Sequence, residues 1–221
     1  MKSTAIIIPA RYNSSRFPGK ALTLVDGQPL VKRVADRCRD SGYPVYITTD
    51  DQRIANAVNN EYTTLVDKNI YRNGTERCAN ILSQDYMDPY TQFVNVQVDL
   101  CDVTTDMIEK TVWHLQHYAI TTLWSNTSKR DTWDSNTVKL INSGDTAVWF
   151  TRHIIYNYGR KHLGLYGIRR SELQRYPSLE VTIEEQLESL EQLRWIKAGY
   201  TIGALGINDN SRSIDVEADL G

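Results

Sequence analysis

The chain has 221 residues, 41% of them hydrophobic and 24% charged, with a formal net charge of −2 at pH 7. At roughly 100–200 residues per domain, this length predicts one domain over residues 1–221 with its own hydrophobic core. The balance of 25 basic and 27 acidic residues lacks the positive excess of nucleic-acid binders, and no apolar run approaches the roughly 20 residues of a membrane span. We therefore expect a protein that binds neither nucleic acid nor membrane.

The amino-terminus and the cysteines indicate a reducing compartment. Residues 1–3 lead directly into an apolar run, without the pattern of a cleavable signal peptide. Cys38, Cys78 and Cys101 are odd in number, widely spaced and without a CxxC pair, which favours buried free thiols over disulfides. These features predict a cytoplasmic protein.

The apolar pattern predicts strands and helices in alternation. Short apolar runs rich in β-branched residues predict strands at 4–8, 44–49, 62–66, 92–98 and 119–124, and two β runs at 137–142 and 146–150 flank a turn at 143–145. Helical spacing predicts a helix that begins at Pro29 and stops at Gly42, helices at 76–86, 104–117 and 182–197, and one capped by Asp50 that carries Ile54, Ala55 and Val58. Thr182 and Glu185 resemble a capping box for the last helix, which is expected to bury Ile183, Leu187, Leu190 and Leu193.

This order predicts an α/β fold with a mainly parallel sheet covered by helices on both faces. In such sheets, ligands bind beyond the carboxyl ends of the strands. The loop after the first strand, residues 9–20, contains Arg11, Arg16, Lys20 and no acid. It lacks the GxxxxGK[ST] and GxGxxG patterns, and by itself it would fit a solvated basic loop. Its place at the ligand edge favours a phosphate-binding loop of another type, with small residues at 13–15 and arginine forks facing an anion.

Eight stretches in register carry a resemblance to a known family. Residues 7–20 (IIPARYNSSRFPGK) resemble the IPARYxSxRxPGK signature of 3-deoxy-manno-octulosonate (Kdo) cytidylyltransferases, also called CMP-Kdo synthetases. In the same order, residues 73–77 (NGTER) resemble SGTER, 95–99 (NVQVD) resemble NVQGD, 135–139 (SNTVK) resemble PNxVK, 150–152 (FTR) resemble FSR, 162–167 (HLGLYG) resemble HLGxYG, 190–194 (LEQLR) match LEQLR, and 214–215 (ID) resemble the VD of VDTPEDL. Together they span nearly the whole chain.

The resemblance implies a fold and an activity. The fold would be the Rossmann-like one of nucleotide-diphospho-sugar transferases, a mainly parallel mixed sheet flanked by helices. A small antiparallel β extension at about 125–165 would serve sugar binding or dimerisation. The activity would be transfer of CMP from CTP to the anomeric hydroxyl of Kdo or a related sugar acid with release of pyrophosphate, in lipopolysaccharide biosynthesis. A homodimer and a Mg²⁺ cofactor are implied as well.

The resemblance also implies roles for particular residues. Catalytic roles would fall to Arg11, Arg16, Lys20 and Asp99, nucleotide binding to Ala10, Arg11, Gly74, Arg77 and Gln97, sugar binding to Gln97, Arg152, His162, Tyr166, Glu191 and Gln192, and Mg²⁺ binding to Asp99 and Asp215. Magnesium binds through one or two carboxylates with phosphate oxygens and water, and arginine pairs with a carboxylate through two parallel bonds. Without the resemblance, Asp99 reads as a turn or helix cap, His162 as a structural histidine, and Glu185, Glu188 and Gln192 as one solvated helix face.

The chain departs from the family at the metal strand. Val98, Leu100 and Cys101 stand where the VQGDEP pattern has glycine, glutamate and proline, and a β-branched residue cannot easily adopt the dihedrals that glycine permits. The stretch between Arg152 and His162 is also shorter than in the family, which predicts a rearranged sugar-facing loop. Two alternatives therefore stay open. The chain could activate another sugar acid, such as a sialic acid, or bind CTP with reduced or no catalysis.

Overall fold

The computed structural model describes residues 3–13, 17–155, 159–208 and 214. Within these residues the main sheet has nine strands in the order β5-β4-β1-β6-β10-β7-β11-β9-β8. Their bounds are β1 Thr4–Ala10, β4 Val45–Thr49, β5 Thr63–Val66, β6 Gln92–Val96, β7 Ile120–Ser125, β8 Lys139–Ser143, β9 Thr146–Thr151, β10 Arg160–Arg169 and β11 Ile202–Gly206. A two-stranded ribbon, β2 (Leu24–Val25) with β3 (Gln28–Pro29), lies apart from this sheet.

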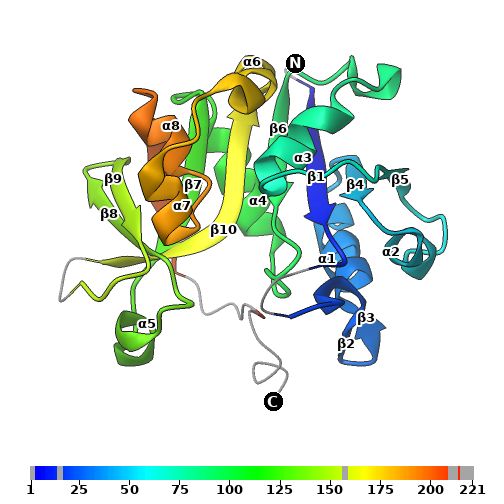
Figure 1. The fold of residues 1–221 in the computed structure, drawn as a ribbon, viewed down its shortest axis with the longest axis horizontal. Coiled ribbons are helices and arrows are strands. Elements are labelled where there is room, and N and C mark those ends of the chain that lie inside the picture. The colour runs from blue at the N-terminus through cyan, green and yellow to red at the C-terminus, as the bar shows by residue number, and fades with distance from the viewer. Residues whose placement is uncertain (1–2, 14–16, 156–158, 209–213, 215–221) are drawn as a thin grey trace.

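The sheet is mixed, with one reversed strand at its centre. Strands β5, β4, β1 and β6 are parallel neighbours, and β7 pairs in parallel with β11. Strand β10 runs antiparallel between β6 and β7, so its first residues lie beside the carboxyl ends of both (Figure 1). Strands β8 and β9 form an antiparallel hairpin at the sheet edge, with a turn at Gly144 as the sequence predicts.

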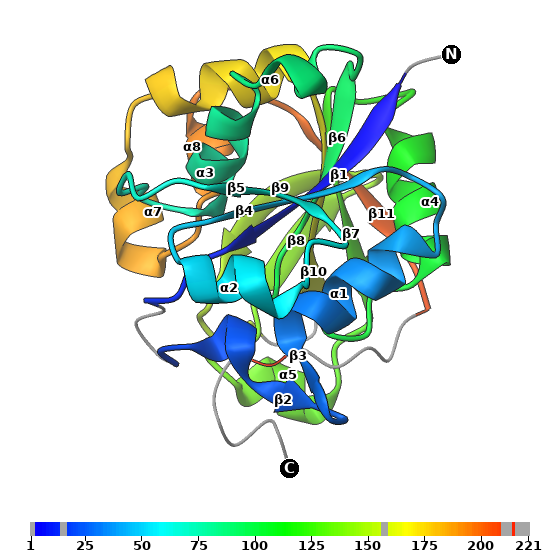
Figure 2. The ribbon, with the colours of Figure 1, turned by 90° about the vertical axis from the view of Figure 1, so that its right-hand side faces the viewer.

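Helices cover both faces of the sheet (Figure 2). The helices are α1 Leu30–Arg39, α2 Gln52–Ala57, α3 Gly74–Ile81, α4 Thr105–His114, α5 Lys129–Trp133, α6 Arg170–Arg175, α7 Ile183–Glu188 and α8 Leu193–Lys197, with single 3₁₀ turns at Lys20–Leu22, Asp85–Met87 and Tyr176–Ser178. In Figure 2, α3, α6, α7 and α8 lie on the left of the sheet, and α1 and α4 on the right.

Strand β1 shows why this fold has two cores. All seven of its residues are buried, which explains its unbroken apolar sequence. Because side chains alternate along a strand, Ile6 and Ile8 pack into the core that contains α1 and α4, whereas Ala5 and Ile7 pack into the core that contains α3 and α8. A strand buried on both faces holds the basic loop that follows it in a fixed position.

Two helix starts differ from the sequence prediction by one residue. Pro29 is the residue before α1 and Leu30 the first helical residue, while Gly42, with a φ of 77°, lies beyond the end of the helix. Asp51, not Asp50, caps α2, and its carboxylate accepts a hydrogen bond from the Arg53 backbone N–H. The two aspartates are adjacent, so the sequence pattern alone could not choose between them.

The predicted helix over 182–197 is wrong as a continuous helix. Thr182 does cap α7 by accepting from the Glu185 N–H, but the helix ends at Ser189, which has left-handed dihedrals (φ 53°, ψ 47°). Leu190 and Leu193 are buried, whereas Ile183 is 68% and Leu187 80% exposed. The break turns the apolar stripe of α7 away from the core that α8 enters.

The structure also bears on membranes and disulfides. Among the described residues, no helix is long and apolar enough to cross a bilayer. The three cysteines are buried and free, and burial raises the pKa of Cys38 and Cys78 thiols. The prediction of buried free thiols is confirmed.

The broken helix predicts unequal costs for the same substitution. Leu193→Ala removes a fully buried side chain and is expected to destabilise the protein by about 2–5 kcal/mol. Leu187→Ala, the matched change on α7, should alter stability by less than about 0.5 kcal/mol because that side chain is exposed. Denaturant unfolding of both variants measures the difference, and equal costs would contradict the break at Ser189.

Candidate active site

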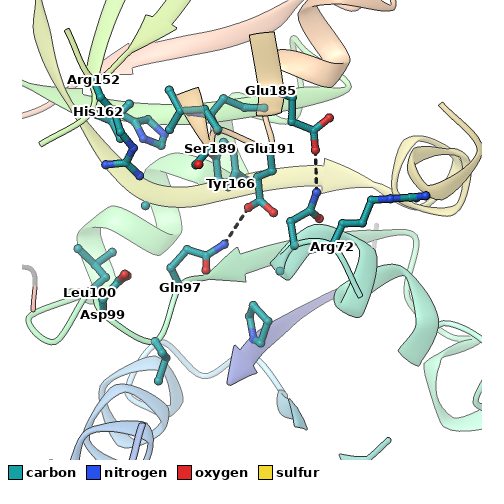
Figure 3. Close-up of a pocket in the computed structure, with 18 of the residues that line it drawn as sticks. Arg72, Gln97, Asp99, Leu100, Arg152, His162, Tyr166, Glu185, Ser189 and Glu191 are labelled. Atoms are coloured by element: carbon teal, nitrogen blue, oxygen red, sulfur yellow. Dashed lines mark hydrogen bonds between the residues drawn. The ribbon is translucent and has the colours of Figure 1, made fainter. Parts of the chain in front are cut away.

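A cavity of about 740 Å³ opens beside the ends of β1 and β6, the start of β10, α3 and α7. Figure 3 shows that its side chains come from distant segments: Asp99 and Gln97 from the loop after β6, Arg152 from the residue after β9, His162 from β10, and Glu185, Ser189 and Glu191 from α7 and the segment that follows it. Eleven of the residues predicted from sequence line it, namely Arg11, Lys20, Gly74, Arg77, Gln97, Asp99, Arg152, His162, Tyr166, Glu191 and Gln192. The tertiary structure thus gathers residues that lie up to 181 positions apart, between 11 and 192.

Of the three remaining predicted site residues, one lies beside the cavity and two are not described by the structure. The Ala10 side chain is fully buried at the end of β1, so only the backbone there can face a ligand. Arg16 and Asp215 lie outside the described residues. Their predicted roles stay predictions.

Lys20 and Asp99 form an ion pair at the floor of the cavity. The Lys20 Nζ lies 3.0 Å from Asp99 Oδ2 and also donates to the backbone carbonyl of Ile214 at 3.1 Å. The Ile214 N–H donates in turn to the Asp99 carbonyl at 3.0 Å. Ile214 directly precedes Asp215 in the sequence. Three segments, the first loop, the loop after β6 and the carboxyl-terminal region, therefore meet at Asp99.

A single carboxylate such as that of Asp99 is compatible with a magnesium ion. The described residues contain no cluster of three or more His, Cys, Asp or Glu side chains suited to a metal. Mg²⁺ does not need such a cluster, because one or two carboxylates with substrate phosphates and water complete its coordination. Val98 does not have a positive φ, so a β-branched residue fits where the family pattern has glycine. The departure at Val98 therefore does not strain the backbone next to Asp99.

Asp50 joins the basic loop to the opposite wall. One carboxylate oxygen accepts the Tyr12 backbone N–H at 2.8 Å, and the other lies 3.8 Å from the Arg77 guanidinium. Arg77 also donates to the Asp67 carbonyl at 3.2 Å and lies over the Tyr71 ring. Instead of capping a helix, Asp50 fixes the base of the loop and the direction of Arg77.

Gln97 and Glu191 form the polar centre of the cavity. Gln97 Nε2 donates to one oxygen of Glu191 at 3.0 Å (Figure 3), and the Thr75 backbone N–H donates to the other at 2.9 Å. A side chain on Gly74 would place its Cβ 3.1 Å from Gln97 Nε2 and 3.2 Å from Pro9 Cγ, so a larger residue would crowd the amide. Burial raises the pKa of Glu191, and the Thr75 N–H opposes that rise. With its nitrogen used by Glu191, the Gln97 amide can offer its oxygen to a ligand.

His162 is neutral and held in one tautomer. The Thr122 hydroxyl donates to the Leu165 carbonyl at 2.7 Å, so at 2.9 Å from His162 Nε2 it can only accept. The ring proton must then be on Nε2, which leaves Nδ1 as an acceptor. Burial, with a smaller contribution from Arg152, lowers the pKa of His162 to about 3. His162 therefore acts through hydrogen bonds and not through charge at neutral pH.

Glu188 orients Arg152. Its carboxylate accepts the Thr151 hydroxyl at 2.6 Å and the Arg152 backbone N–H at 2.8 Å, and its carbonyl accepts Arg152 Nε at 3.1 Å. Arg152 Nη1 also donates to the Asn136 carbonyl at 2.9 Å. The alternative interpretation of Glu188 as part of a solvated face does not hold, because its side chain is 14% exposed and faces Thr151 and Arg152.

Sequence reasoning missed several lining residues. The cavity also contains Arg72, Asn73, Asn136, Thr137, Lys161, Glu185, Gln186 and Ser189. Glu185, expected on the solvated face, is only 7% exposed. Asn73 and Asn136 lie inside stretches that match the family pattern, and this position was the signal available in the sequence. The helix break that places Glu185 and Ser189 had no such signal.

Comparison with known proteins matches this chain to cytidylyltransferases. A family model described as "Cytidylyltransferase" matches residues 5–202. The chain is 35% identical to a 3-deoxy-manno-octulosonate cytidylyltransferase of Parabacteroides distasonis, with 97% of this chain and 94% of that protein covered. It is 31% identical to the Escherichia coli protein of the same name, with 100% and 94% covered.

Solved structures agree with the fold. A structure of CMP:2-keto-3-deoxy-manno-octonic acid synthetase complexed with CTP superposes with a TM-score of 0.88 at 29% identity, covering 99% of this chain and 95% of that one. An inositol-1-phosphate CTP transferase from T. maritima shares the fold alone, at 14% identity and a TM-score of 0.69. That superposition covers 100% of this chain and 92% of the other. The family suggested by the eight sequence stretches is thereby confirmed, and the chain belongs to the 3-deoxy-manno-octulosonate cytidylyltransferases.

Proposed function

We propose that the chain transfers CMP from CTP to the anomeric hydroxyl of Kdo, or of a close 2-keto-3-deoxy relative, and releases pyrophosphate. The observation that supports this most directly is the common cavity. The Lys20–Asp99 ion pair, the Gln97–Glu191 pair, Arg152 and His162 all line it. Such an arrangement suits a triphosphate with its metal next to a polyhydroxylated acid. Transfer of this kind is catalysed mainly by positioning and charge stabilisation, so no nucleophilic side chain is needed.

The basic loop would bind the triphosphate. Arg11 and Lys20 line the cavity, and with Arg16, assigned from the sequence pattern alone, they would offset charge developing on the pyrophosphate. The backbone at Ala10, with Gly74 and Arg77, would bind the cytidine. Gly74 leaves the free space there that a Cβ would fill.

Asp99 would hold Mg²⁺, with Asp215 as its predicted partner. The ion, when bound, supplies Lewis-acid polarisation of the α-phosphate. Lys20, which pairs with Asp99 in the structure, can then turn its ammonium group to a phosphate oxygen. Ile214 supports the pairing of these two carboxylates, since its backbone bonds to both Asp99 and Lys20.

The sugar acid would bind in the part of the cavity that contains Arg152 and His162. Arg152, held by Glu188, offers a guanidinium to the substrate carboxylate, and the Gln97 oxygen with His162 Nδ1 would accept substrate hydroxyls. Tyr166, Glu191 and Gln192 complete this side. We assign residues 125–165, which include the β8–β9 hairpin and the start of β10, to sugar binding and to a homodimer contact, and the enzyme to the cytoplasm.

Replacement of Asp99 tests the proposed activity. With CTP, magnesium and Kdo, the unmodified chain should release pyrophosphate, and Asp99→Ala should lower that rate by about 10²-fold or more because the metal loses a ligand. Asp102→Asn is the matched control, since Asp102 pairs with Arg33 outside the cavity. Full activity in Asp99→Ala would remove the metal assignment. Release only with a sialic acid, or CTP binding without turnover of any acid, would contradict the proposed substrate or the proposed catalysis.

Arg152→Lys is expected to raise the KM for the sugar acid about tenfold or more. Loss of a charged, forked hydrogen bond costs about 1.5–3 kcal/mol, and 1.4 kcal/mol is about a factor of ten. The KM for CTP should change by less than about threefold if the sites are separate in this way. Arg160→Lys, on β10 beside Asn126, serves as control. Equal changes in both KM values would place Arg152 elsewhere in the mechanism.

The raised pKa of Glu191 predicts a pH dependence. As the pH falls, Glu191 takes up a proton at a higher pH than an ordinary glutamate, and the protonated oxygen becomes a donor and a weak acceptor, which weakens one of the two hydrogen bonds from Gln97 and Thr75. The KM for the sugar acid should therefore rise on acidification, beginning above the ordinary glutamate value. Glu191→Gln should show a raised KM that is flat over the same range. Steady-state kinetics of both proteins across pH measures this, and identical profiles would contradict it.

A further inference from the structure

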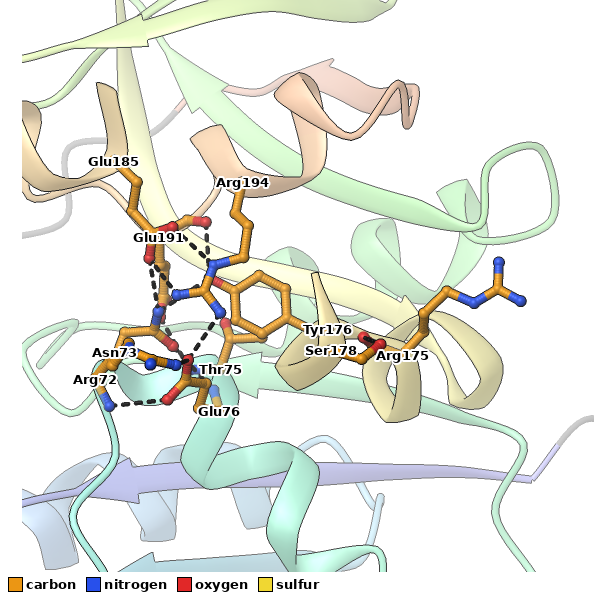
Figure 4. Close-up of polar contacts among 10 residues, drawn as sticks. All are labelled: Arg72, Asn73, Thr75, Glu76, Arg175, Tyr176, Ser178, Glu185, Glu191 and Arg194. Carbon is orange, nitrogen blue, oxygen red and sulfur yellow. Dashed lines mark hydrogen bonds and ion pairs between the residues drawn. The ribbon is translucent and has the colours of Figure 1, made fainter. Parts of the chain in front are cut away.

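A fully buried arginine joins two carboxylates from distant segments. Arg194, at the start of α8, donates to Glu185 of α7 through Nε at 2.7 Å and Nη2 at 2.6 Å, and to Glu76 of α3 through Nη1 at 2.7 Å. Its side chain is 0% exposed, and those of Glu185 and Glu76 are 9% and 8% exposed (Figure 4). This cluster connects α3 with both helices of the α7–α8 pair.

Asn73 uses its whole amide to bridge the same segments. Its oxygen caps α3 by accepting the Glu76 N–H at 2.9 Å. Its nitrogen donates to Glu185 at 3.1 Å and to the Tyr176 hydroxyl at 2.9 Å. The family pattern SGTER has serine here, and a serine could cap the helix but carries no amide nitrogen for the second and third bonds. The bridge is thus a property of this chain's own residue.

The cluster continues into the cavity through Glu191. The Tyr176 hydroxyl donates to the Glu191 carbonyl at 2.9 Å, and the Glu191 carboxylate accepts from Thr75 and Gln97. Asn73 and Thr75 are the two neighbours of Gly74, on the side assigned to the nucleotide. Hydrogen bonds therefore run without interruption from the nucleotide side to the segment that carries the sugar-side groups.

Burial of this cluster is not explained by stability alone. Removing charges from water costs several kcal/mol per ion. A buried ion pair therefore adds little net stability compared with well-packed apolar residues of similar volume. What three ions and an amide supply is a single geometry, because the planar guanidinium fixes the directions of its partners. Small errors in such geometry are costly for catalysis.

We infer that Asn73 and Arg194 are positioning residues that couple the two substrate sites, holding the nucleotide-side loop 72–75 to the α7–α8 segment. Binding of CTP against this loop then restrains the segment that presents Glu188 and Glu191, before the sugar acid arrives. This inference rests on the proposed function, because it takes CTP as the ligand of loop 72–75.

Hydrogen–deuterium exchange with and without CTP and magnesium tests the coupling. In the unmodified chain, CTP should slow exchange of backbone amides in residues 183–193 by about fivefold or more, the lower end of coupling between sites. In Asn73→Ser and in Arg194→Lys this slowing should fall below about twofold, which is less than coupling between two sites typically produces. In Asn73→Ser the slowing in α3 should persist, because serine keeps the cap.

Two matched controls separate coupling from general loosening. Asn80→Ser removes an amide of the same helix that donates to Asp67, and Arg170→Lys removes a guanidinium that donates to the Tyr90 and Met87 carbonyls. Both should keep the CTP-dependent slowing, even where thermal stability falls. Equal slowing in Asn73→Ser, or none in the unmodified chain with CTP bound, would overturn the inference. Absence of CTP binding in calorimetry would instead remove the proposed function, and the inference with it.

Discussion

The site depends on the pairing of β10 with β6. A strand reversed in the middle of a mainly parallel sheet brings its beginning to the edge where the neighbouring strands end. The Gln97 N–H donates to the Gly164 carbonyl at 3.1 Å, which places the loop carrying Asp99 against His162 and Tyr166. In a wholly parallel sheet these groups would lie at opposite ends of their strands. One antiparallel strand thus brings the residues proposed for the nucleotide and those proposed for the sugar acid into one cavity.

Buried polar contacts fix the geometry of the cavity wall. Glu188, Glu191 and Glu185 lie within the seven consecutive residues 185–191 around the break at Ser189, yet each faces a different partner: Arg152, Gln97 and Arg194. A non-glycine residue in the left-handed region costs about 1–3 kcal/mol and persists only where its surroundings fix it. The surrounding carboxylate bonds supply that constraint, since a straight helix could not direct all three.

Much of the framework follows from local pattern. The five strands expected at 4–8, 44–49, 62–66, 92–98 and 119–124 correspond to β1, β4, β5, β6 and β7. Strands β1, β4, β6 and β7 are mostly buried, whereas β5, at the edge of the sheet, is only partly buried. No strand was predicted over β10 or β11, whose glycines lower β propensity. These glycines are needed for tertiary packing. A Cβ on Gly167 would lie 2.6 Å from Thr121, and one on Gly203 would lie 2.4 Å from Tyr118. Close packing, which no local pattern reports, requires them.

The sequence by itself determined the family, the alternation of strands with helices and eleven of the residues that line the cavity, because motif residues and apolar periodicity are local properties of the chain. Only the tertiary structure decided how those residues act. It showed that Asp50 orders a loop instead of a helix, that Glu185 and Glu188 point inward, and that Lys20 pairs with Asp99. These are choices of partner between segments far apart in the chain, and they are set by hydrogen bonds and charges that exist only once the sheet has brought the segments together.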